Sequence, residues 1–525
     1  MARIFLVLCF AFALNGCGEF KSPTENSSPA DASDQPKTKD QAVGAGRLGQ
    51  LTAGVAKVEI TNKNVIPAND PLYVKALVLR TDDATAVIIT IDAVAIGEIG
   101  SIGNDYLSKV RARLQKELKI APESVLVNAS HCHGSVCADV DAKTVDAVAK
   151  AVANMVPVRA GVGVGTENRV SENRRLKLKS GKEADVRHAY SLPSDEEVIG
   201  VGPIDPQIGV LRLDKLDGQT LAVVYNFACH PIMGVLGDGN TADIVGFASR
   251  VIENNSSDGT IALFIQGCAG DINPVRYKDV AHPRHAEPLG NILGLSVLQA
   301  ARKTKCVDGP ALRIVNEKIA LPRADHAELI DILVAEQAKL VRSLQGTTLN
   351  LKTFLELTTK YSLSNEFPSF DSHLYLTEKA QGREDLRKLD EANRKNLRAY
   401  IANIEAMEKL TRVQTNLALL QKHQAANLAA GRKPLEVEMV GLRVGDFVLV
   451  TFPGELTVEI GLQVKKTSPH PTTFVAGYTN GYIYYTPTAQ QLKSSGGAQE
   501  DSDCRVAPEW EQLYYAKVAD ILKKL

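Results

Sequence analysis

Four apolar runs of strand length, far apart in the chain, each end in small and polar residues. They are residues 221–227 (LAVVYNF) before Ala-Cys-His230, 261–265 (IALFI) before Gly-Cys-Ala-Gly-Asp271, 447–451 (FVLVT) before Phe-Pro-Gly-Glu455, and 473–476 (TFVA) before Gly-Tyr-Thr-Asn-Gly481. In α/β sheets, the polar loops beyond strand ends are where ligands gather. We therefore expect the four ends to converge on one site.

Strand-like and helical patterns alternate elsewhere in the chain. Residues 86–92 (AVIITID) form a dense apolar run, residues 105–120 carry an apolar helical stripe, and residues 124–128 form a short strand before His131. This order predicts an α/β fold with layered mixed β-sheets flanked by helices. Residues 323–432 are leucine-rich with helical spacing and mixed charges. We expect a long helical insertion there, acting either as a lid or partner surface or as packing decoration.

The N-terminus has the pattern of an export signal. After Arg3, residues 4–14 form an apolar run, which is shorter than the roughly 20 residues of a membrane-spanning helix and is typical of a secretory signal peptide. The run ends in Leu-Asn-Gly-Cys17, which resembles a lipobox whose cysteine is acylated. The alternative is ordinary cleavage, with Cys17 incidental.

The next stretch, residues 18–46, is rich in Ser, Pro, Asp and Lys and lacks an apolar period. We therefore predict a disordered tether that lets a soluble domain work away from a membrane. The expected organisation is a signal peptide over residues 1–16, a tether over 17–47 that begins at the lipidated Cys17, and a folded domain over 48–525. The predicted location is the bacterial cell envelope, in the periplasm or on the outer membrane.

Bulk properties exclude several classes of function. The net charge is −1 over 525 residues and no basic stripe stands out, so nucleic-acid binding is not indicated. There is no Gly-x-Ser-x-Gly elbow for a serine triad and no phosphate-binding P-loop. Six cysteines remain beyond Cys9 and Cys17, and the sequence leaves their pairing open.

Histidines and one glutamate suggest a metal site. His131 and His133 are two residues apart, so on an extended segment they project to the same side. His230 and Glu455 each follow a predicted strand. Imidazole nitrogens and a carboxylate suit catalytic zinc, which keeps one position open for water and lowers the pKa of that water to about 7. A structural histidine pair is the alternative.

Cysteines beside these positions offer a competing ligand set. Cys132, Cys229 and Cys268 all lie next to the proposed site, and zinc binds thiolates well. Adjacent residues on an extended chain point in opposite directions, which favours buried cysteines or a disulfide instead. The Gly-rich turn before Asp271 has the composition of a structural turn, but it could equally place Asp271 near the metal.

Seven short motifs follow one another along the chain. They are Gly54-Val-Ala-Lys-Val-Glu-Ile-Thr61, Ser130-His-Cys-His-Gly-Ser135, Asn173-Arg174, Phe227-Ala-Cys-His-Pro231, Gln266-Gly-Cys-Ala-Gly-Asp-Ile-Asn-Pro274, Pro453-Gly-Glu455 and Asn480-Gly-Tyr-Ile-Tyr-Tyr485. In this order they resemble the neutral/alkaline non-lysosomal ceramidase family, and the likeness runs from about Leu51 to the C-terminus.

The resemblance implies a zinc amidase that cleaves the N-acyl bond of ceramide to a sphingoid base and a fatty acid. It implies four zinc ligands, which are His131, His230, Glu455 and Tyr485. It gives His133 an acid/base and oxyanion role, and Arg174 a role in holding the polar head of the substrate or the oxyanion. We add Asp271 as a candidate catalytic residue and Asn273 as a candidate substrate-binding residue.

The sequence departs from the family pattern in three places. Asn273 stands where some members carry serine, residues 494–500 offer no tyrosine near the substrate, and the C-terminal immunoglobulin-like domain of larger members is not expected. The expected partners are a lipid-like small molecule and, through the anchor, a membrane. Two alternatives stay open: a metallohydrolase of other amides or esters, and a non-catalytic surface lipoprotein that binds a ligand.

Overall fold

A computed structural model describes residues 49–186, 192–236, 239–277, 279–368, 372–431, 433–493 and 497–525. The predicted signal peptide, Cys17 and the tether over 17–47 lie outside these ranges. Within them, no helix combines the length and the apolar character that a membrane crossing requires.

The largest sheet has eight strands in the order β12-β11-β10-β5-β1-β2-β3-β4. The strands are β1 (Thr52–Glu59), β2 (Tyr73–Arg80), β3 (Thr85–Ile91), β4 (Val125–Ala129), β5 (Val156–Thr166), β10 (Gln207–Lys215), β11 (Thr220–Phe227) and β12 (Ile261–Gln266). The sheet is mixed, because β3 pairs with β4 and β11 with β12 in parallel while the other pairs are antiparallel. Strands β4, β11 and β12 are buried along their whole length, as expected where both faces of a sheet are covered.

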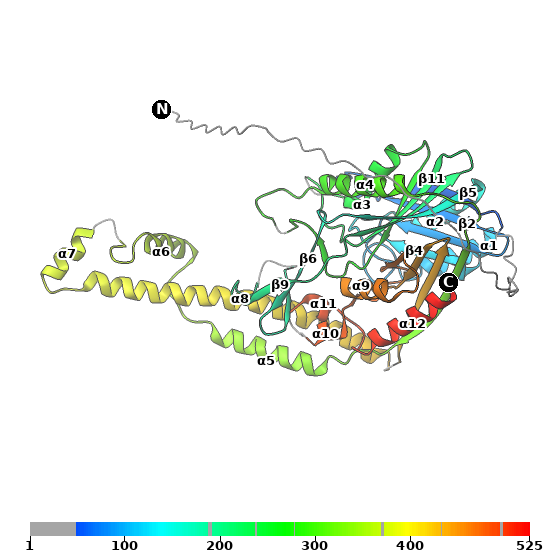
Figure 1. The fold of residues 1–525 in the computed structure, drawn as a ribbon. Coiled ribbons are helices and arrows are strands. Elements are labelled where there is room, and N and C mark those ends of the chain that lie inside the picture. Colours follow the sequence, from blue (N-terminus) through cyan, green and yellow to red (C-terminus); the bar gives the residue numbers. More distant parts are fainter. Residues whose placement is uncertain are drawn as a thin grey trace, which may run out of the picture. The chain divides into compact units, whose positions relative to one another are not determined.

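Helices cover one face of this sheet (Figure 1). Helix α2 (Val140–Ala153) packs over β1 and β2 with α1 (Tyr106–Leu118) beside it, while α3 (Asp243–Asn254) packs over β12 and α4 (Ala286–Lys303) over β5 and β10. The apolar stripe predicted over residues 105–120 is the buried face of α1, formed by Tyr106, Val110 and Leu114.

A second, four-stranded sheet packs against the other face. It has the order β14-β15-β16-β18, with strands β14 (Leu312–Leu321), β15 (Leu435–Val444), β16 (Phe447–Thr451) and β18 (Thr473–Ala476). One apolar core joins Leu211 and Leu263 of the large sheet to Leu449 and Phe474 of the small one. Helices α9 (Val458–Thr467) and α12 (Trp510–Lys524) cover the outer side of the small sheet. The predicted fold class of layered mixed sheets flanked by helices is thereby confirmed.

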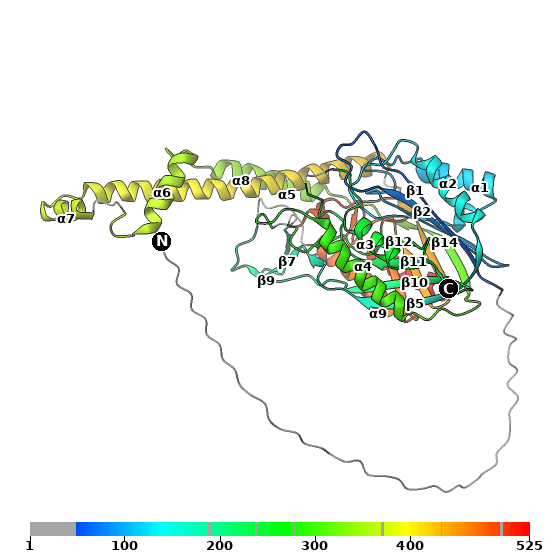
Figure 2. The same ribbon diagram turned by 90° about the horizontal axis from the view of Figure 1, so that it is seen from above.

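The helical insertion lies between β14 and β15, which pair with each other as antiparallel neighbours. It contains α5 (Ala327–Ser343), α6 (Leu351–Leu363), α7 (Ser372–Ala380) and the 45-residue α8 (Asp385–Ala429). Helix α5 packs along α8 through Leu333, Leu417 and Leu420. Helices α6 and α7 lie against the N-terminal part of α8, as Figure 2 shows.

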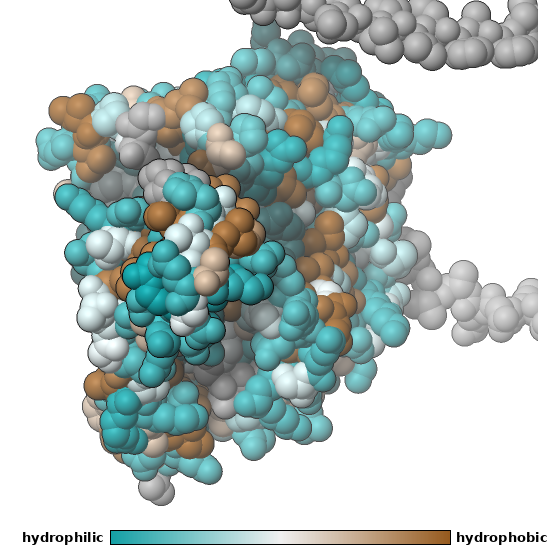
Figure 3. Space-filling view, turned by 90° about the vertical axis from the view of Figure 1, so that its left-hand side faces the viewer, coloured by the Kyte–Doolittle hydropathy of each residue, from teal (hydrophilic) through white to brown (hydrophobic). Residues whose placement is uncertain are grey.

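The surface of the insertion is mixed in character. Seen from the side on which α7 lies, brown hydrophobic residues are scattered among teal hydrophilic ones (Figure 3). Exposed apolar side chains there include Leu351, Leu363 and Leu376. This mixture agrees with the mixed charges and helical spacing seen in the sequence.

Short strands and helices complete the fold around the strand ends. They are β6 (Ser171–Asn173), β7 (Arg175–Leu178), β8 (Glu183–Asp185), β9 (Val198–Val201), β13 (Ile272–Pro274), β17 (Glu455–Leu456), β19 (Tyr485–Thr486), α10 (Ala489–Leu492) and α11 (Gln499–Ser502). Two of the pairings matter for the site: β6 pairs with β13, and β17 with β19.

Candidate metal centre

His131 lies two residues beyond β4, in a backbone conformation with φ of +67°. Such a φ is uncommon for a residue with a Cβ and is held only where the surroundings impose it. Here the His131 N–H donates to the carbonyl of Ala93 at 2.9 Å, and Nδ1 lies 2.6 Å from the carbonyl of Val94. A carbonyl can only accept, so Nδ1 carries the proton and Nε2 of the neutral ring keeps its lone pair for a ligand.

His230 follows β11 and is oriented in the same way. Its N–H and its Nδ1 both bond to the carbonyl of Ile272, at 2.9 and 3.0 Å. Nε2 of His230 is therefore the ring nitrogen that faces the cluster, and it lies 3.1 Å from Oε2 of Glu455. Two histidines from different strand ends thus aim Nε2 at one carboxylate.

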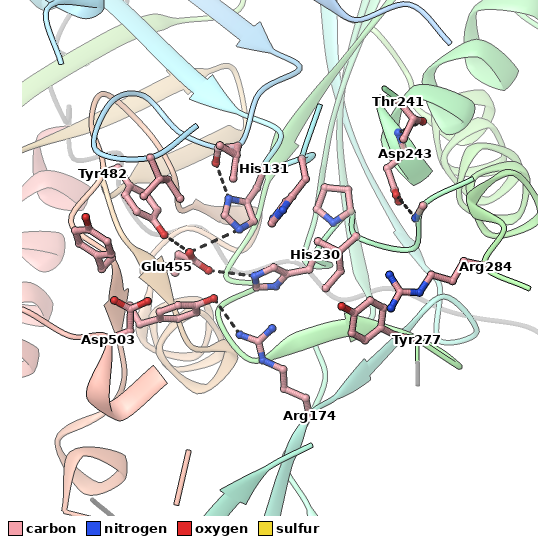
Figure 4. A pocket seen from close by; sticks show the side chains of 18 of the residues that line it. His131, Arg174, His230, Thr241, Asp243, Tyr277, Arg284, Glu455, Tyr482 and Asp503 are labelled. Carbon is pink, nitrogen blue, oxygen red and sulfur yellow. Dashed lines mark hydrogen bonds and ion pairs between the residues drawn. The ribbon is translucent and has the colours of Figure 1, made fainter. Parts of the chain in front are cut away.

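Glu455 completes the cluster (Figure 4). Its Oε1 lies 3.6 Å from Nε2 of His131, and one ligand atom from each of the three side chains lies within 4.8 Å of the others. All three side chains are buried. Two phenols also donate to this carboxylate, Tyr478 at 3.1 Å and Tyr482.

The carboxylate is held in its ionised form. Burial by itself raises the pKa of Glu455, but positive charge on the His131 and His230 imidazoles, together with the hydrogen bonds from His230 and Tyr482, outweighs it, so the net effect is a pKa well below the usual range. Two imidazole nitrogens and an anionic oxygen suit zinc and several other divalent transition metals. The residues therefore fit a metal ion of this kind.

Thiolates do not join the cluster. Among the described His, Cys, Asp and Glu residues, the group of three that could hold a metal is His131, His230 and Glu455. Burial raises the pKa of the Cys132, Cys229 and Cys268 thiols, which keeps them protonated. Every cysteine in the described part of the chain is free of disulfide bonds. The alternative Cys/His ligand set has no support here.

Tyr485 is brought beside Glu455 by strand pairing. Strands β17 and β19 are parallel, with Glu455 and Tyr485 as register partners. The Tyr485 side chain is buried and lines the same cavity as both histidines. Its hydroxyl accepts a hydrogen bond of 3.3 Å from Nη2 of Arg174. The sequence alone does not predict that Glu455 and Tyr485 are neighbours, because 29 residues lie between them.

Arg174 is buried and committed to protein partners. Nε donates to Oε1 of Glu500 at 2.6 Å, Nη1 to Oδ1 of Asn273 at 2.9 Å, and Nη2 to the Gly270 carbonyl and to Tyr485. Burial by itself lowers the pKa of Arg174, but Glu500, Tyr485 and Glu455 raise it overall, so the charge is permanent. Arg174 lines the cavity, and of the four partners named here Tyr485 is the one that lines it too.

Asp271 and Asn273 lie behind the site. Neither is among the side chains that line the cavity. Asn273 accepts from Arg174, while Asp271 accepts from the Val458 N–H at 2.8 Å and from Asn173 at 3.1 Å. Burial raises the pKa of Asp271 to about 6. The structure places them as supports of the site wall, whereas the sequence suggested catalytic and substrate-binding positions.

His133 is exposed and lies at the cavity beside His131, with ring centroids 5.5 Å apart. The two rings therefore reach the same side of the loop, as their spacing predicts. The cavity measures about 470 Å³.

Sequence reasoning missed several lining residues, among them Thr241, Asp243, Tyr277, Arg284, Lys422, Tyr482, Tyr484 and Asp503. The two tyrosines lie inside the Asn480-Gly-Tyr-Ile-Tyr-Tyr485 motif, which could have nominated them. Lys422 had no such signal, because it lies in the helical insertion.

The layered sheets and the buried N, N, O cluster at their strand ends define an α/β protein with a candidate catalytic metal centre. Two solved structures share its fold. A neutral ceramidase from Pseudomonas aeruginosa superposes with a TM-score of 0.56 at 15% identity, over 90% of this chain and 74% of that one. A ceramidase complexed with C2 gives 0.55 at 16% identity, over 90% and 75%.

The chain therefore has the neutral ceramidase fold, as the resemblance of its motifs predicts. No family model and no curated protein sequence matches it. At this level of identity the likeness is one of fold, and the chemistry has to be argued from the site.

Proposed function

We propose that this protein is a zinc-dependent hydrolase that cleaves the N-acyl amide bond of a ceramide-like lipid. The observation that carries the proposal is the meeting of His131, His230 and Glu455, with ligand atoms within 4.8 Å of one another at the base of a cavity. Similarity of fold to ceramidases points to the same class of substrate.

In this proposal, His131, His230, Glu455 and Tyr485 hold the metal. When bound, zinc would supply a water of lowered pKa and polarise the scissile carbonyl. The two backbone carbonyls behind the imidazoles fix their orientation, and such partners are worth roughly 10- to 100-fold in metal affinity or activity. Arg174 holds the Tyr485 phenol in place.

His133 is the group available for proton transfer. It is exposed, lies next to His131 and lines the cavity. A protonated imidazole can donate a hydrogen bond to the developing oxyanion and deliver a proton to the leaving amine. We assign both functions to His133. In this loop, His131 then binds the metal and His133 transfers the proton.

The proposal is tested by zinc content and ceramide turnover of the mature protein. We expect about one zinc per chain and release of fatty acid from a short-chain fluorescent ceramide. His131→Ala should lose both. His282→Ala is the matched control, because His282 is exposed and does not line the cavity. Turnover that survives His131→Ala would refute the metal mechanism. Zinc-dependent turnover of esters but not of ceramide would refute the amide substrate and identify the protein as an esterase.

We further propose that the protein is exported and anchored by lipid at Cys17. The support is the apolar run that ends in Leu-Asn-Gly-Cys17 and the polar tether that follows it. Radiolabelled palmitate should be incorporated by the wild-type protein and not by Cys17→Ser. Equal incorporation, or none in either, would contradict the anchor.

A further inference from the structure

The C-terminal half of α8 forms part of the wall of the candidate metal centre. Nη1 of Arg412 donates to the carbonyl of Gly497 at 2.7 Å, and Nε2 of His423 lies 2.6 Å from Oδ1 of Asp503. The carbonyl of Asp503 in turn accepts the N–H of Tyr485 at 3.1 Å. The helical insertion is therefore fixed to the strand that carries a proposed metal ligand.

This anchoring places Lys422 at the cavity. Lys422 is adjacent to the buried His423, and it is exposed and lines the cavity. Its Nζ lies 2.9 Å from the hydroxyl of Tyr484 and 4.3 Å from the centroid of that ring. The Tyr484 ring packs 5.1 Å from the ring of Tyr482, which donates to Glu455. Two tyrosine rings thus separate the ammonium from the metal cluster.

The acidic groups that line the cavity already have partners. Asp503 pairs with His423, and Asp243 accepts three backbone N–H groups at 2.6 to 3.3 Å. Glu455 belongs to the metal cluster. Lys422, by contrast, has no carboxylate partner in the described ranges, where its bonds are to a phenol and a ring face. The carboxylate of Glu98 lies 3.5 Å from the same Tyr484 hydroxyl, but it pairs with Nη1 of Arg505 at 3.6 Å, so Lys422 offers the cavity an ammonium without a direct ion pair in the described ranges.

A second cation lies across the cavity. Arg284 packs over the Tyr277 ring at 4.8 Å and, within the described residues, also makes no ion pair. Figure 4 shows Arg284 and Tyr277 on the His230 side of the cluster, with Asp503 on the opposite side. Lys422 contacts Tyr484, which packs against Tyr482, and Tyr482 lies on the same side of the cluster as Asp503 in Figure 4. The two cations therefore lie on opposite sides of the metal cluster. A cleft flanked in this way attracts anions.

We propose that the preferred substrate is an anionic N-acyl amide, and that Lys422 is the specificity residue that binds its negative group. The inference rests on the proposed amide hydrolase function and predicts that, among its amide substrates, an anionic amide is preferred over a neutral ceramide. A lysine ammonium is a compact point charge suited to carboxylate, phosphate or sulfonate. A neutral ceramide would leave that ammonium without a counter-ion.

Turnover is tested with a matched pair, N-dodecanoylglycine and the neutral N-dodecanoylethanolamine. Hydrolysis of the first consumes one water, breaks the amide C–N bond and releases dodecanoate and glycine. We expect Lys422→Met to lower kcat/KM about tenfold on the anionic amide and less than about twofold on the neutral one, as loss of a close charge pair would. Lys422→Arg should retain the preference. Lys409→Met is the control, because Lys409 is an exposed lysine of α8 that does not line the cavity.

Binding is tested without turnover, using (dodecyloxy)acetate and 2-(dodecyloxy)ethanol, which have no amide to cleave. With the zinc-loaded protein, calorimetry should show about tenfold weaker binding of the anionic ether to Lys422→Met, and unchanged binding of the neutral ether. If neither amide is hydrolysed but this binding difference is found, the hydrolase function fails and the anion site stands. If the substitution affects both ethers equally, or neither, the anion site is refuted whatever the enzyme hydrolyses.

Discussion

The guanidinium of Arg174 bridges the phenol oxygen of Tyr485, 3.3 Å from Nη2, and the carboxylate of Glu500, 2.6 Å from Nε. All three side chains are buried. A buried cation of this kind can hold a phenol in a fixed place because its planar fork directs several N–H groups at once. The geometry of Tyr485 therefore depends on Arg174.

Replacing Arg174 should separate its positioning role from its structural role. Arg174→Gln removes the closer guanidinium partner of Glu500 and should cost about 3 kcal/mol in the free energy of unfolding, as breaking a buried ion pair does. Arg174→Lys keeps the charge but not the fork, so we expect a smaller loss of stability and a fall in kcat of roughly tenfold or more. Urea unfolding and steady-state kinetics measure the two effects. A lysine variant with wild-type kcat would show that Tyr485 needs no such support.

Removing the phenol of Tyr485 should weaken metal binding. Tyr485→Phe keeps the ring and deletes one proposed ligand, so we expect zinc affinity to fall by about tenfold or more while the fold is retained. Competition with a chromophoric chelator measures the affinity. Tyr514→Phe is the control, because Tyr514 is also buried and its hydroxyl has no hydrogen-bond partner in the described part of the chain. Equal affinities in the two variants would remove Tyr485 from the ligand set.

Zinc should stabilise the folded protein. A metal that binds only the native state adds about 4 kcal/mol when its free concentration is 1,000 times Kd. We expect a chelator to lower the Tm of the wild-type protein and to leave the Tm of Glu455→Gln unchanged, since that variant loses the anionic ligand but keeps its shape. Thermal unfolding followed by circular dichroism checks this. A chelator-induced shift of equal size in both proteins would place the metal elsewhere.

The stability of the protein should fall as the pH rises from about 4 to about 6, in part through Asp271. Burial raises the folded-state pKa of this carboxyl to about 6, above the ordinary 3.8. The native state then binds the proton more tightly than the unfolded state, so the stabilisation is present below pH 4 and lost as the pH passes the folded-state pKa. The contribution is on the order of 2–3 kcal/mol.

Asp271→Asn, which mimics the protonated carboxyl, should flatten this part of the stability profile. Urea unfolding at pH 4, 5, 6 and 7 measures it. Because Asp271 does not line the cavity, we expect kcat to change by less than the roughly 10²-fold typical of a lost acid–base group. A larger loss of kcat with an unaltered stability profile would restore Asp271 to the catalytic residues.

Local sequence determined much of the fold and part of the site. In the N-terminal half, apolar residues recur with the spacing of strands and helices because those side chains face a core. Burial imposes this spacing directly on the sequence. The spacing of His131 and His133 put both rings on one side of a loop for the same local reason. His230 and Glu455 could be nominated because each follows a strand made recognisable by its apolar run.

Other features depended on contacts between distant segments. The assignment of Asp271 as catalytic and of Asn273 as substrate-binding rested on their place in a Gly-rich turn, but the direction in which a turn faces is set by what packs against it. Here the N–H of Val458 donates a hydrogen bond to Asp271, and the guanidinium of Arg174 donates one to Asn273. No local sequence pattern distinguishes Lys422, because the sequence of a charged helix does not show which of its lysines lies at a cavity.

The sequence by itself determined the alternation of strands and helices, the helical character of the insertion and the identity of the imidazole and carboxylate groups, because each of these follows from neighbours a few residues away. Only the tertiary structure decided that β17 pairs with β19 and brings Tyr485 beside Glu455, and that α8 returns to set Lys422 at the cavity. Those contacts join segments tens of residues apart, and their geometry comes from packing of the whole core.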